Sequence, residues 1–556
     1  MGRPFPESGY DPVTGEWNDS LTGDFLWSNV NVSEAVPDVM TPSTWSLWWI
    51  HHYEANPFEF PGTQPFCGNI CGRPYLNLSL LVSVYRAIGK EVRKELQDDM
   101  IGSASLDQNI PTIPFSAFQV FRRMLPGLLK SQVQAQRDQK AIPPYLGAMP
   151  SWCRHMRQNI RECEGPQNLL PFWQAEIRPT VLRACRMLRS VSLMLADPAG
   201  RLRQNLAALA GEADANAILS NLSGATGDLE SLGPLLGLAK VRDGRMSREE
   251  YLDRYGHRGP HEMELFASGA DDDPAWLEKR LAEFDCSETD VDLLLGKQRQ
   301  EALSAMQRFE ARFPKKIGAT RRALSRVAAA ARNREAVRSE MTRLVRLVRI
   351  YLLRAGEMSG LNDDIFFLSL DESARVLSGE KGLAERIPAR RAAYERYSVL
   401  PPYPAILVGR FDPFAWAADS NRRSDYFDAR QTIARDVEPV LRGFPGAVGC
   451  AEGVVRRINR PEEGDSLQPG EILVTATTNV GWTPLFPRAA AIVTDVGAPL
   501  SHAAIVAREL GIPAVVGCGD ATARLRTGDR VRVDGARGVV EILGHGKGRT
   551  GGIKVT

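Results

Sequence analysis

The chain has 556 residues, which is too long for one ordinary hydrophobic core, so several domains are expected. Its net charge of +2, from 69 basic and 67 acidic side chains, gives no general field that would attract nucleic acid or an anionic membrane. No apolar run approaches the roughly 20 residues of a membrane span, and the first residues lack the apolar core of a signal peptide. We therefore predict a cytoplasmic protein that binds neither nucleic acid nor membrane, and in which any phosphate site is local.

The eight cysteines are scattered along the chain and do not form the pattern of a disulfide framework. Cys67 and Cys71 have no second cysteine or histidine pair nearby that would complete a zinc site. We expect reduced thiols with structural roles and no bound metal.

Three regions of different character precede residue 447. Residues 1–74 are rich in Pro, Gly, Trp and Asn with little periodicity, which predicts an extended connector whose aromatic side chains pack on the next domain. Residues 75–397 carry apolar residues at three- and four-residue spacings, which predicts a large all-α domain. These spacings are clearest at 76–100, 179–195 and 320–353. Recurrent prolines in residues 398–446 predict an interdomain connector.

Residues 447–544 predict a compact β/α domain. Short β-rich runs alternate there with turns and with one clear helix at 501–510. The runs lie at 453–456, 471–475, 491–494, 513–516, 530–533 and 539–543. A Gly-rich polar tail, 545–556, is expected to be flexible. The predicted fold class is therefore multidomain, with a large all-α domain and a C-terminal β/α domain.

His502 is the strongest candidate for chemistry. It stands at the first turn of the predicted helix, where unpaired N–H groups and the helix dipole favour an anion. A neutral imidazole is nucleophilic near pH 7, so His502 can carry a phosphoryl group. Ser501 and Thr494 supply hydroxyls that could reach phosphate oxygens or orient the ring. For an isolated Ser-His pair, a histidine that only caps a helix would be the alternative.

The sequence around His502 closely resembles the swivelling phosphohistidine domain of phosphoenolpyruvate-utilising enzymes, from 491 to 517 and on through 525–535. That group includes phosphoenolpyruvate synthase, pyruvate phosphate dikinase and rifampicin phosphotransferase. The resemblance implies that His502 carries the phosphoryl group and that Thr494, Gly497 and Ser501 form its environment. Ala498 stands where the family often has a second glycine, and it fits the turn only with a negative φ.

Three segments that precede residue 398, namely 27–42, 255–262 and 333–338, resemble the substrate-binding domain of rifampicin phosphotransferase and its relatives. The resemblance implies that this domain binds the phosphoryl acceptor. Arg334 and Arg338 are four residues apart and share one helix face, where they could converge on one phosphate. The resemblance places the family's basic pair at these positions, with lysine as the second member in rifampicin phosphotransferase. A solvated basic face is the alternative, because arginines are abundant in this stretch.

His257 and Arg258 form a possible acceptor site. His257 could take a proton from the acceptor hydroxyl, or it could hold a helix corner. Two further groups have both a functional and a structural interpretation. Asp363 and Asp364 could bind a metal or accept a proton, but they also fit a helix N-cap. A tryptophan cluster could line an acceptor pocket or pack in the core; it consists of Trp45, Trp48 and Trp49.

Enzymes of this group usually carry an ATP-grasp domain, and the sequence has no glycine-rich phosphate loop of the Walker type. The barrel that handles phosphoenolpyruvate also has no counterpart in the sequence. We therefore expect a split enzyme that resembles phenylphosphate synthase and the two-subunit systems that phosphorylate cresols. A separate ATP-grasp subunit would hold ATP and Mg²⁺, and no cofactor would be tightly bound to this chain.

The predicted function is that of the histidine-and-acceptor subunit of an ATP-dependent phosphotransferase. The β-phosphoryl group of ATP would pass through His502 to a small-molecule hydroxyl, a phenol or aromatic alcohol, with release of AMP and phosphate. The domain would swing about residues 398–447 between loading and delivery. The alternatives are a non-catalytic phosphohistidine carrier or regulatory protein and an enzyme similar to phosphoenolpyruvate synthase.

Overall fold

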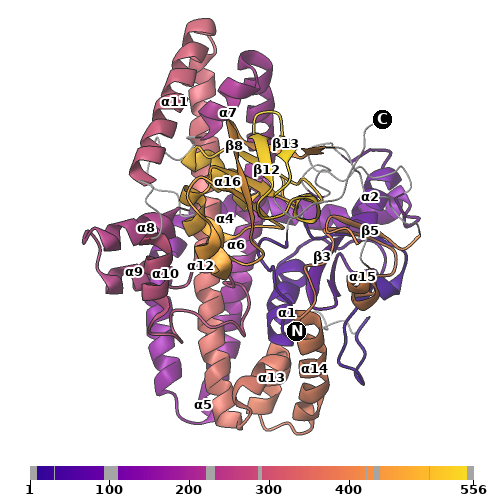
Figure 1. Ribbon diagram of the computed structural model, residues 1–556. Helices are drawn as coiled ribbons and strands as arrows, with labels where there is room; N and C mark the ends of the chain where they lie inside the picture. The colour runs from indigo at the N-terminus through magenta and orange to yellow at the C-terminus, as the bar shows by residue number, and fades with distance from the viewer. Residues whose placement is uncertain are drawn as a thin grey trace.

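A computed structural model gives the fold of most of the chain. It describes residues 9–30, 32–92, 100, 110–220, 232–285, 291–419, 422–430, 439–499 and 501–546. The part of the tail beyond residue 546 and parts of the predicted helix 76–100 lie outside the described residues. The described chain forms a bundle of long helices and two β-sheets; in Figure 1, β8 and β12 of one sheet lie in the upper middle, and β3 and β5 of the other lie to the right.

The first sheet joins two regions that the sequence analysis assigned to connectors. Its strand order is β2-β3-β1-β4-β5. The strands are β1 (Leu26–Ser28), β2 (Cys67–Ile70), β3 (Arg73–Asn77), β4 (Ile406–Val408) and β5 (Tyr426–Asp428). Residues 1–74 are therefore not an extended connector. The sequence does not reveal the strands of this sheet, because strands of three to five residues that are almost wholly buried show no alternation of polar and apolar side chains.

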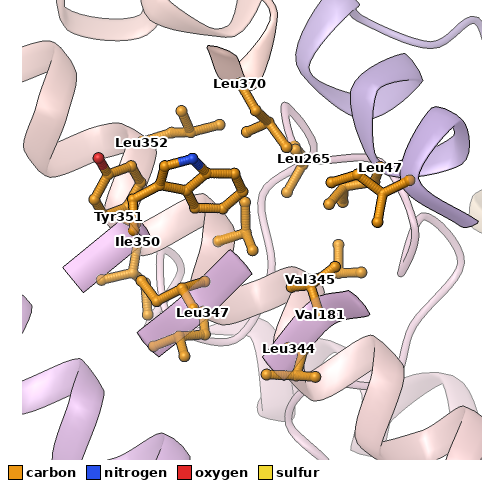
Figure 2. Packing of buried hydrophobic residues seen from close by; sticks show 14 of the residues in the cluster. Leu47, Val181, Leu265, Leu344, Val345, Leu347, Ile350, Tyr351, Leu352 and Leu370 are labelled. Carbon is orange, nitrogen blue, oxygen red and sulfur yellow. The ribbon is translucent and has the colours of Figure 1, made fainter. Parts of the chain in front are cut away.

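The helical bundle is built around three long helices, which confirms the predicted helical character of this region. They are α4 (Ala117–Glu162), α6 (Arg178–Ala210) and α12 (Ile317–Ser359). Residues 339–352 of α12 are buried on every face, because α4, α6 and the segment around Leu265 surround them. Figure 2 shows Leu344, Leu347 and Tyr351 of α12 in this core. The helix ends at Gly360, whose left-handed φ of 73° suits glycine.

Shorter helices surround the three long ones. Near the N-terminus are α1 (Pro42–Trp49), the helical turn η2 (Ile50–Glu54) and α2 (Leu78–Ala87). Between α6 and α12 lie α7 (Glu212–Ser220), α8 (Gly233–Arg242), α9 (Arg248–Tyr255), α10 (Trp276–Asp285) and α11 (Val291–Arg312). After α12 come η4 (Asn362–Phe367), α13 (Leu370–Leu377), α14 (Ile387–Ser398) and α15 (Pro413–Ala418). None of the helices in the described ranges has the length and apolar character that crossing a membrane requires.

The second sheet has eight strands in the order β6-β13-β12-β8-β9-β10-β11-β7. They are β6 (Val440–Arg442), β7 (Phe444–Ala447), β8 (Cys450–Arg457), β9 (Ile472–Thr475), β10 (Ala491–Thr494), β11 (Ala514–Val516), β12 (Arg530–Asp534) and β13 (Val539–Gly544). All six predicted strands of this region are present. The predicted connector 398–446 also contains β6 and β7, so only the residues between Asp428 and Val440 connect the two sheets.

The C-terminal sheet unit is docked on the helical region through one apolar cluster. The cluster contains Phe486 and Ala503 of the sheet unit together with Leu235, Tyr255 and Phe284 of α8, α9 and α10. In Figure 1 the sheet unit, labelled β8, β12 and β13 and including the helix α16 (His502–Leu510), lies beside the long helices. Docking of this kind buries apolar surface that either part alone would expose to water.

Candidate functional site

The structure places His502 at the start of α16 (His502–Leu510), as the sequence predicted. Strand β10 ends at Thr494, and Ser501 caps the helix by accepting a hydrogen bond from the Ala504 N–H at 3.4 Å. Gly497 has a φ of 151°, and a Cβ there would lie 3.2 Å from Ser501 Oγ. Ala498 is not among the described residues with positive φ, so the turn tolerates its methyl group.

Two threonines hold the imidazole of His502. Thr478 Oγ1 lies 3.1 Å from Nδ1, and Thr483 Oγ1 lies 3.2 Å from Nε2. The ring of Phe486 meets the imidazole edge-on with centroids 6.0 Å apart. The His502 residue is 6% exposed. Both threonines belong to the segment between β9 and β10. Each ring nitrogen therefore has one hydroxyl beside it, and a hydroxyl can reorient toward a phosphate oxygen.

Burial, with a smaller contribution from the positive charge of Arg338, lowers the pKa of His502 to about 3. The docked imidazole is therefore neutral near pH 7. A neutral ring nitrogen keeps the lone pair that a phosphoryl group needs.

Glu34 faces His502 from the N-terminal segment. Its Oε2 accepts a hydrogen bond from the backbone N–H of His502 at 3.0 Å. Burial raises the pKa of Glu34 to about 7, although the His502 N–H, Arg338 and Arg334 act in the opposite direction. A carboxyl group with a pKa near neutrality can take or release a proton under working conditions.

Arg334 and Arg338 lie on α12 close enough to influence both Glu34 and Glu335 electrostatically. Arg334 forms an ion pair with Glu335 at 2.7 Å, and Arg338 lies 3.7 Å from Glu262. Burial alone would raise the pKa of Glu335, but the two arginines outweigh it and lower the pKa to about 2. The basic pair is therefore partly buried and structured, in contrast to a fully solvated basic face.

His257 and Arg258 lie in the corner that follows α9. His257 Nε2 lies 2.9 Å from Ser339 Oγ, and burial holds the pKa of His257 well below its usual value. Arg258 forms an ion pair with Glu262 at 2.8 Å, and the same carboxylate accepts from the Gly259 N–H. These contacts join the corner to α12. Arg258 and Arg338 thus share Glu262, which places the corner directly behind the basic pair.

The other sequence candidates have mainly structural contacts. The hydroxyl of Thr494 is buried, and the imidazole of His502 contacts the hydroxyls of Thr478 and Thr483 instead of those of Thr494 and Ser501. Asp364 of η4 pairs with Arg391 of α14. All three tryptophans are buried, and Trp45 also lines a cavity of about 210 Å³ between the N-terminal segment and α14.

The cysteines and acidic groups do not form a metal site within the described ranges. The seven cysteines in the described ranges are free thiols, and Cys67 and Cys71 are buried. Within those ranges, no group of three or more His, Cys, Asp or Glu side chains is placed to hold a metal ion.

Polar contacts also span the boundary between the sheet unit and the helical region. Asn479 Nδ2 donates to the Pro260 carbonyl at 2.6 Å, and Gly481 packs directly on Pro260. His261 lies 2.5 Å from Asp38 and 3.4 Å from Glu462 of the sheet unit. The corner after α9 is therefore the docking point next to the histidine.

Sequence reasoning missed Glu34, Thr478 and Thr483. Glu34 lies within the segment 27–42 that resembles a substrate-binding domain, but it has no local pattern of its own. The threonines precede His502 by 24 and 19 positions, and no periodic signal connects them to the histidine.

A β/α unit that presents one histidine to a basic face of a separate helical bundle has the architecture of a phosphoryl-carrier domain. Comparison with known proteins defines it further. Residues 467–538 match the family described as PEP-utilising enzyme, mobile domain. This part of the chain is therefore similar to the mobile domain of the phosphoenolpyruvate-utilising enzymes, and we call the C-terminal sheet unit, residues 439–546, the mobile domain from here on.

Several relatives match a larger part of the chain. An uncharacterised protein of Mycobacterium tuberculosis is 34% identical over 302 residues, which are 52% of this chain and 31% of that protein. A rifampicin phosphotransferase of Streptomyces sviceus is 31% identical over 338 residues, 55% of this chain and 36% of that protein. A probable phosphoenolpyruvate synthase of Staphylothermus marinus is 49% identical over 107 residues, 19% of this chain and 13% of that protein. The chain spans about a third of the length of the first two relatives.

Proposed function

We propose that this chain carries a phosphoryl group on His502 and transfers it to a hydroxyl group of a small molecule. The observation that carries the proposal is the position of His502 against Glu34, with Arg338 close enough to alter the pKa of both groups. These residues come from three separate parts of the chain. Relatives named as phosphotransferases, including rifampicin phosphotransferase, support the same activity.

The proposed reaction uses His502, Glu34, the two arginines of α12 and the two threonines beside the imidazole. The acceptor oxygen forms a bond to phosphorus while the bond from phosphorus to the His502 ring nitrogen breaks. Glu34 takes the proton of the acceptor hydroxyl, and the departing imidazole is left needing one proton, which Glu34 returns to it directly or through water. Arg338 and Arg334 stabilise the negative charge on the phosphoryl group during transfer. Thr478 and Thr483 orient the ring.

Loading of His502 requires a second position of the mobile domain. The docked histidine is 6% exposed and is enclosed by Thr478, Thr483 and Glu34. A nucleotide site cannot reach it there, so the domain must undock before loading and dock again for delivery. We propose that a separate ATP-grasp subunit, which binds ATP and Mg²⁺, loads the β-phosphoryl group and releases AMP and phosphate. This arrangement rests on the resemblance to two-subunit relatives, as does a phenol or aromatic alcohol as the acceptor.

Chemical phosphorylation with potassium phosphoramidate tests delivery without a loading partner. Mass spectrometry should find one acid-labile phosphoryl group on the wild-type chain and none at this position in His502→Ala. Adding phenols or alcohols should discharge His502 and produce the corresponding phosphate ester, detected by ³¹P NMR. Discharge only to inorganic phosphate with every hydroxyl acceptor would contradict the transferase and favour a carrier protein.

ATP labelled at the β position tests the loading route. Label should reach His502 only when an ATP-grasp protein is added to the purified chain. Label on the chain alone would refute the two-subunit arrangement while leaving the transfer step intact.

A further inference from the structure

A group of basic side chains lies between η2 and α6, outside the site of His502. His51 and His52 are on η2, and Arg189 is on α6. The two imidazoles meet edge to face with centroids 4.8 Å apart. Arg189 is close enough to lower the pKa of both histidines, after the larger effect of burial. The three side chains therefore form one cluster, which we call the η2 basic cluster.

The η2 basic cluster has no acidic counterpart among the residues that the structure describes. Both ring nitrogens of His52, which is 8% exposed, and Nε of Arg189 are buried without a hydrogen-bond partner. The acids on neighbouring helical turns are engaged elsewhere. Glu54 pairs with Arg178 at 2.7 Å, and Asp138 of α4 accepts from Ser190 at 2.6 Å. Buried polar groups without partners cost free energy unless a ligand satisfies them.

The charge of the cluster is one positive unit at neutral pH. Burial lowers the pKa of Arg189 to about 10, so its guanidinium remains protonated. Burial and Arg189 lower the pKa of His51 to about 4, so this imidazole is neutral. An anion would compensate the guanidinium, and neutral imidazoles could donate one N–H each to its oxygens.

Aromatic rings frame the cluster. Trp48 stacks on His52 with centroids 5.2 Å apart, and the Arg189 guanidinium lies 5.9 Å from the centroid of Phe58. Trp48 also belongs to an apolar cluster that includes Val36, two residues after Glu34, and Val496 of the mobile domain. Apolar packing is therefore continuous from the η2 basic cluster to the mobile domain that carries His502.

We propose that the η2 basic cluster binds the carboxylate of the phosphoryl acceptor, and that the acceptor is a hydroxylated aromatic acid. A planar guanidinium pairs with a carboxylate through two parallel hydrogen bonds, and the ring of the acid matches the aromatic frame. The acceptor identity rests on the proposed function, whereas the carboxylate site does not. The site gives the acceptor a fixed orientation by holding the end opposite the hydroxyl.

Calorimetric titration of the full, unphosphorylated chain tests the site directly. Para-hydroxybenzoate and benzoate should bind the wild type, and phenol should bind at least about tenfold more weakly, because a charge-assisted pair contributes about 1.5–3 kcal/mol. Arg189→Met should weaken para-hydroxybenzoate at least about tenfold and leave phenol unchanged. Arg189→Lys, which retains the charge, should lie between the two. Arg186→Met, an exposed arginine of the same helix, is the matched control and should bind as the wild type does.

Each outcome has a defined meaning. Three results would overturn the carboxylate site. The first is equal binding of phenol and para-hydroxybenzoate, and the second is failure of both acids to bind at millimolar concentration. The third is unchanged binding of para-hydroxybenzoate in Arg189→Met. Thermal unfolding of each variant identifies a loss of binding that is due to misfolding. If Arg189→Met is misfolded, the affinity of Arg189→Lys for para-hydroxybenzoate tests the site in its place. Binding of the acid without its phosphorylation by the phosphoramidate-treated chain would preserve the site and contradict the proposed transfer to it.

Discussion

The backbone N–H of His502 donates a hydrogen bond to Glu34 Oε2 at 3.0 Å, although 468 positions separate the two residues along the chain. The contact joins the first turn of α16 to the N-terminal segment and brings a carboxyl group to the backbone of His502. It places the proposed proton acceptor at the residue proposed to carry the phosphoryl group. The following predictions depend on this docked geometry.

Glu34→Gln should slow discharge of phosphorylated His502 to an acceptor by about 10²-fold, the lower end of the range for general-base catalysis. The base acts when it is unprotonated, and its pKa is raised to about 7, so the wild-type rate should rise with pH up to about 7 and then level off. The variant should lose this rise. Rates are measured by mass spectrometry on both sides of pH 7, with hydrolysis in the absence of acceptor subtracted. The same pH profile in Glu34→Gln would exclude Glu34 as the base.

Arg338→Met should permit chemical phosphorylation of His502 yet slow its discharge by about 10²- to 10³-fold, because one stabilising charge is removed from the transfer site. Arg338→Lys should recover part of the rate, since it keeps the charge and loses the planar geometry. Arg326→Met is the control, because Arg326 is an exposed residue of the same helix. A wild-type discharge rate in Arg338→Met would show that the acceptor lies elsewhere.

Gly481→Ala should weaken docking of the mobile domain without unfolding it. A Cβ at position 481 would lie 2.6 Å from Pro260 Cα, so the added methyl must push the two parts away from each other. We expect a loss of docking free energy of about 1–3 kcal/mol and slower discharge of His502. Small-angle X-ray scattering should give a larger radius of gyration than for the wild type. Gly544→Ala is the control: Gly544 ends β13 of the same mobile domain, its added Cβ would meet open space, and both measurements should stay unchanged.

His261→Ala should also weaken docking, because His261 links Asp38 to Glu462 of the mobile domain. Burial disfavours its charged form, but Asp38 and Glu462 outweigh burial and raise the pKa of His261 to about 10, above the usual 6.5. The link is thus fully present below pH 6.5 and is lost as the pH rises through about 10. The His261 side chain is 36% exposed, so solvent screening limits the contribution of this link to the docking free energy to below about 1 kcal/mol. Scattering at neutral and alkaline pH should show a pH-dependent expansion in the wild type that is absent from the variant.

The sequence predicted the C-terminal domain well because its signals are local. Apolar runs such as 491–494, glycine turns and the Ser501 cap each act within a few residues. The long helices were equally visible, because burial of one helical face repeats every three or four residues. His502 and the pair Arg334 and Arg338 could therefore be selected without coordinates.

The N-terminal sheet was not predictable in this way. Trp27 of β1 pairs with Leu407 of β4, and the whole helical bundle lies between them in sequence. Three-residue strands carry no alternation, and their pairing is determined by packing between distant segments. Prolines near these strands favoured the interpretation as connectors.

The sequence by itself singled out His502 and the pair Arg334 and Arg338, and it determined the helical and β/α character of the parts that hold them, because these signals lie between close neighbours in the chain. Only the tertiary structure decided that Glu34, Thr478 and Thr483 surround His502. It also decided that Arg189 lies among His51, His52 and aromatic rings, away from any carboxylate in the described residues that could pair with it. Burial and the charges of distant neighbours determine these environments, and neither has a period or spacing that a sequence can display.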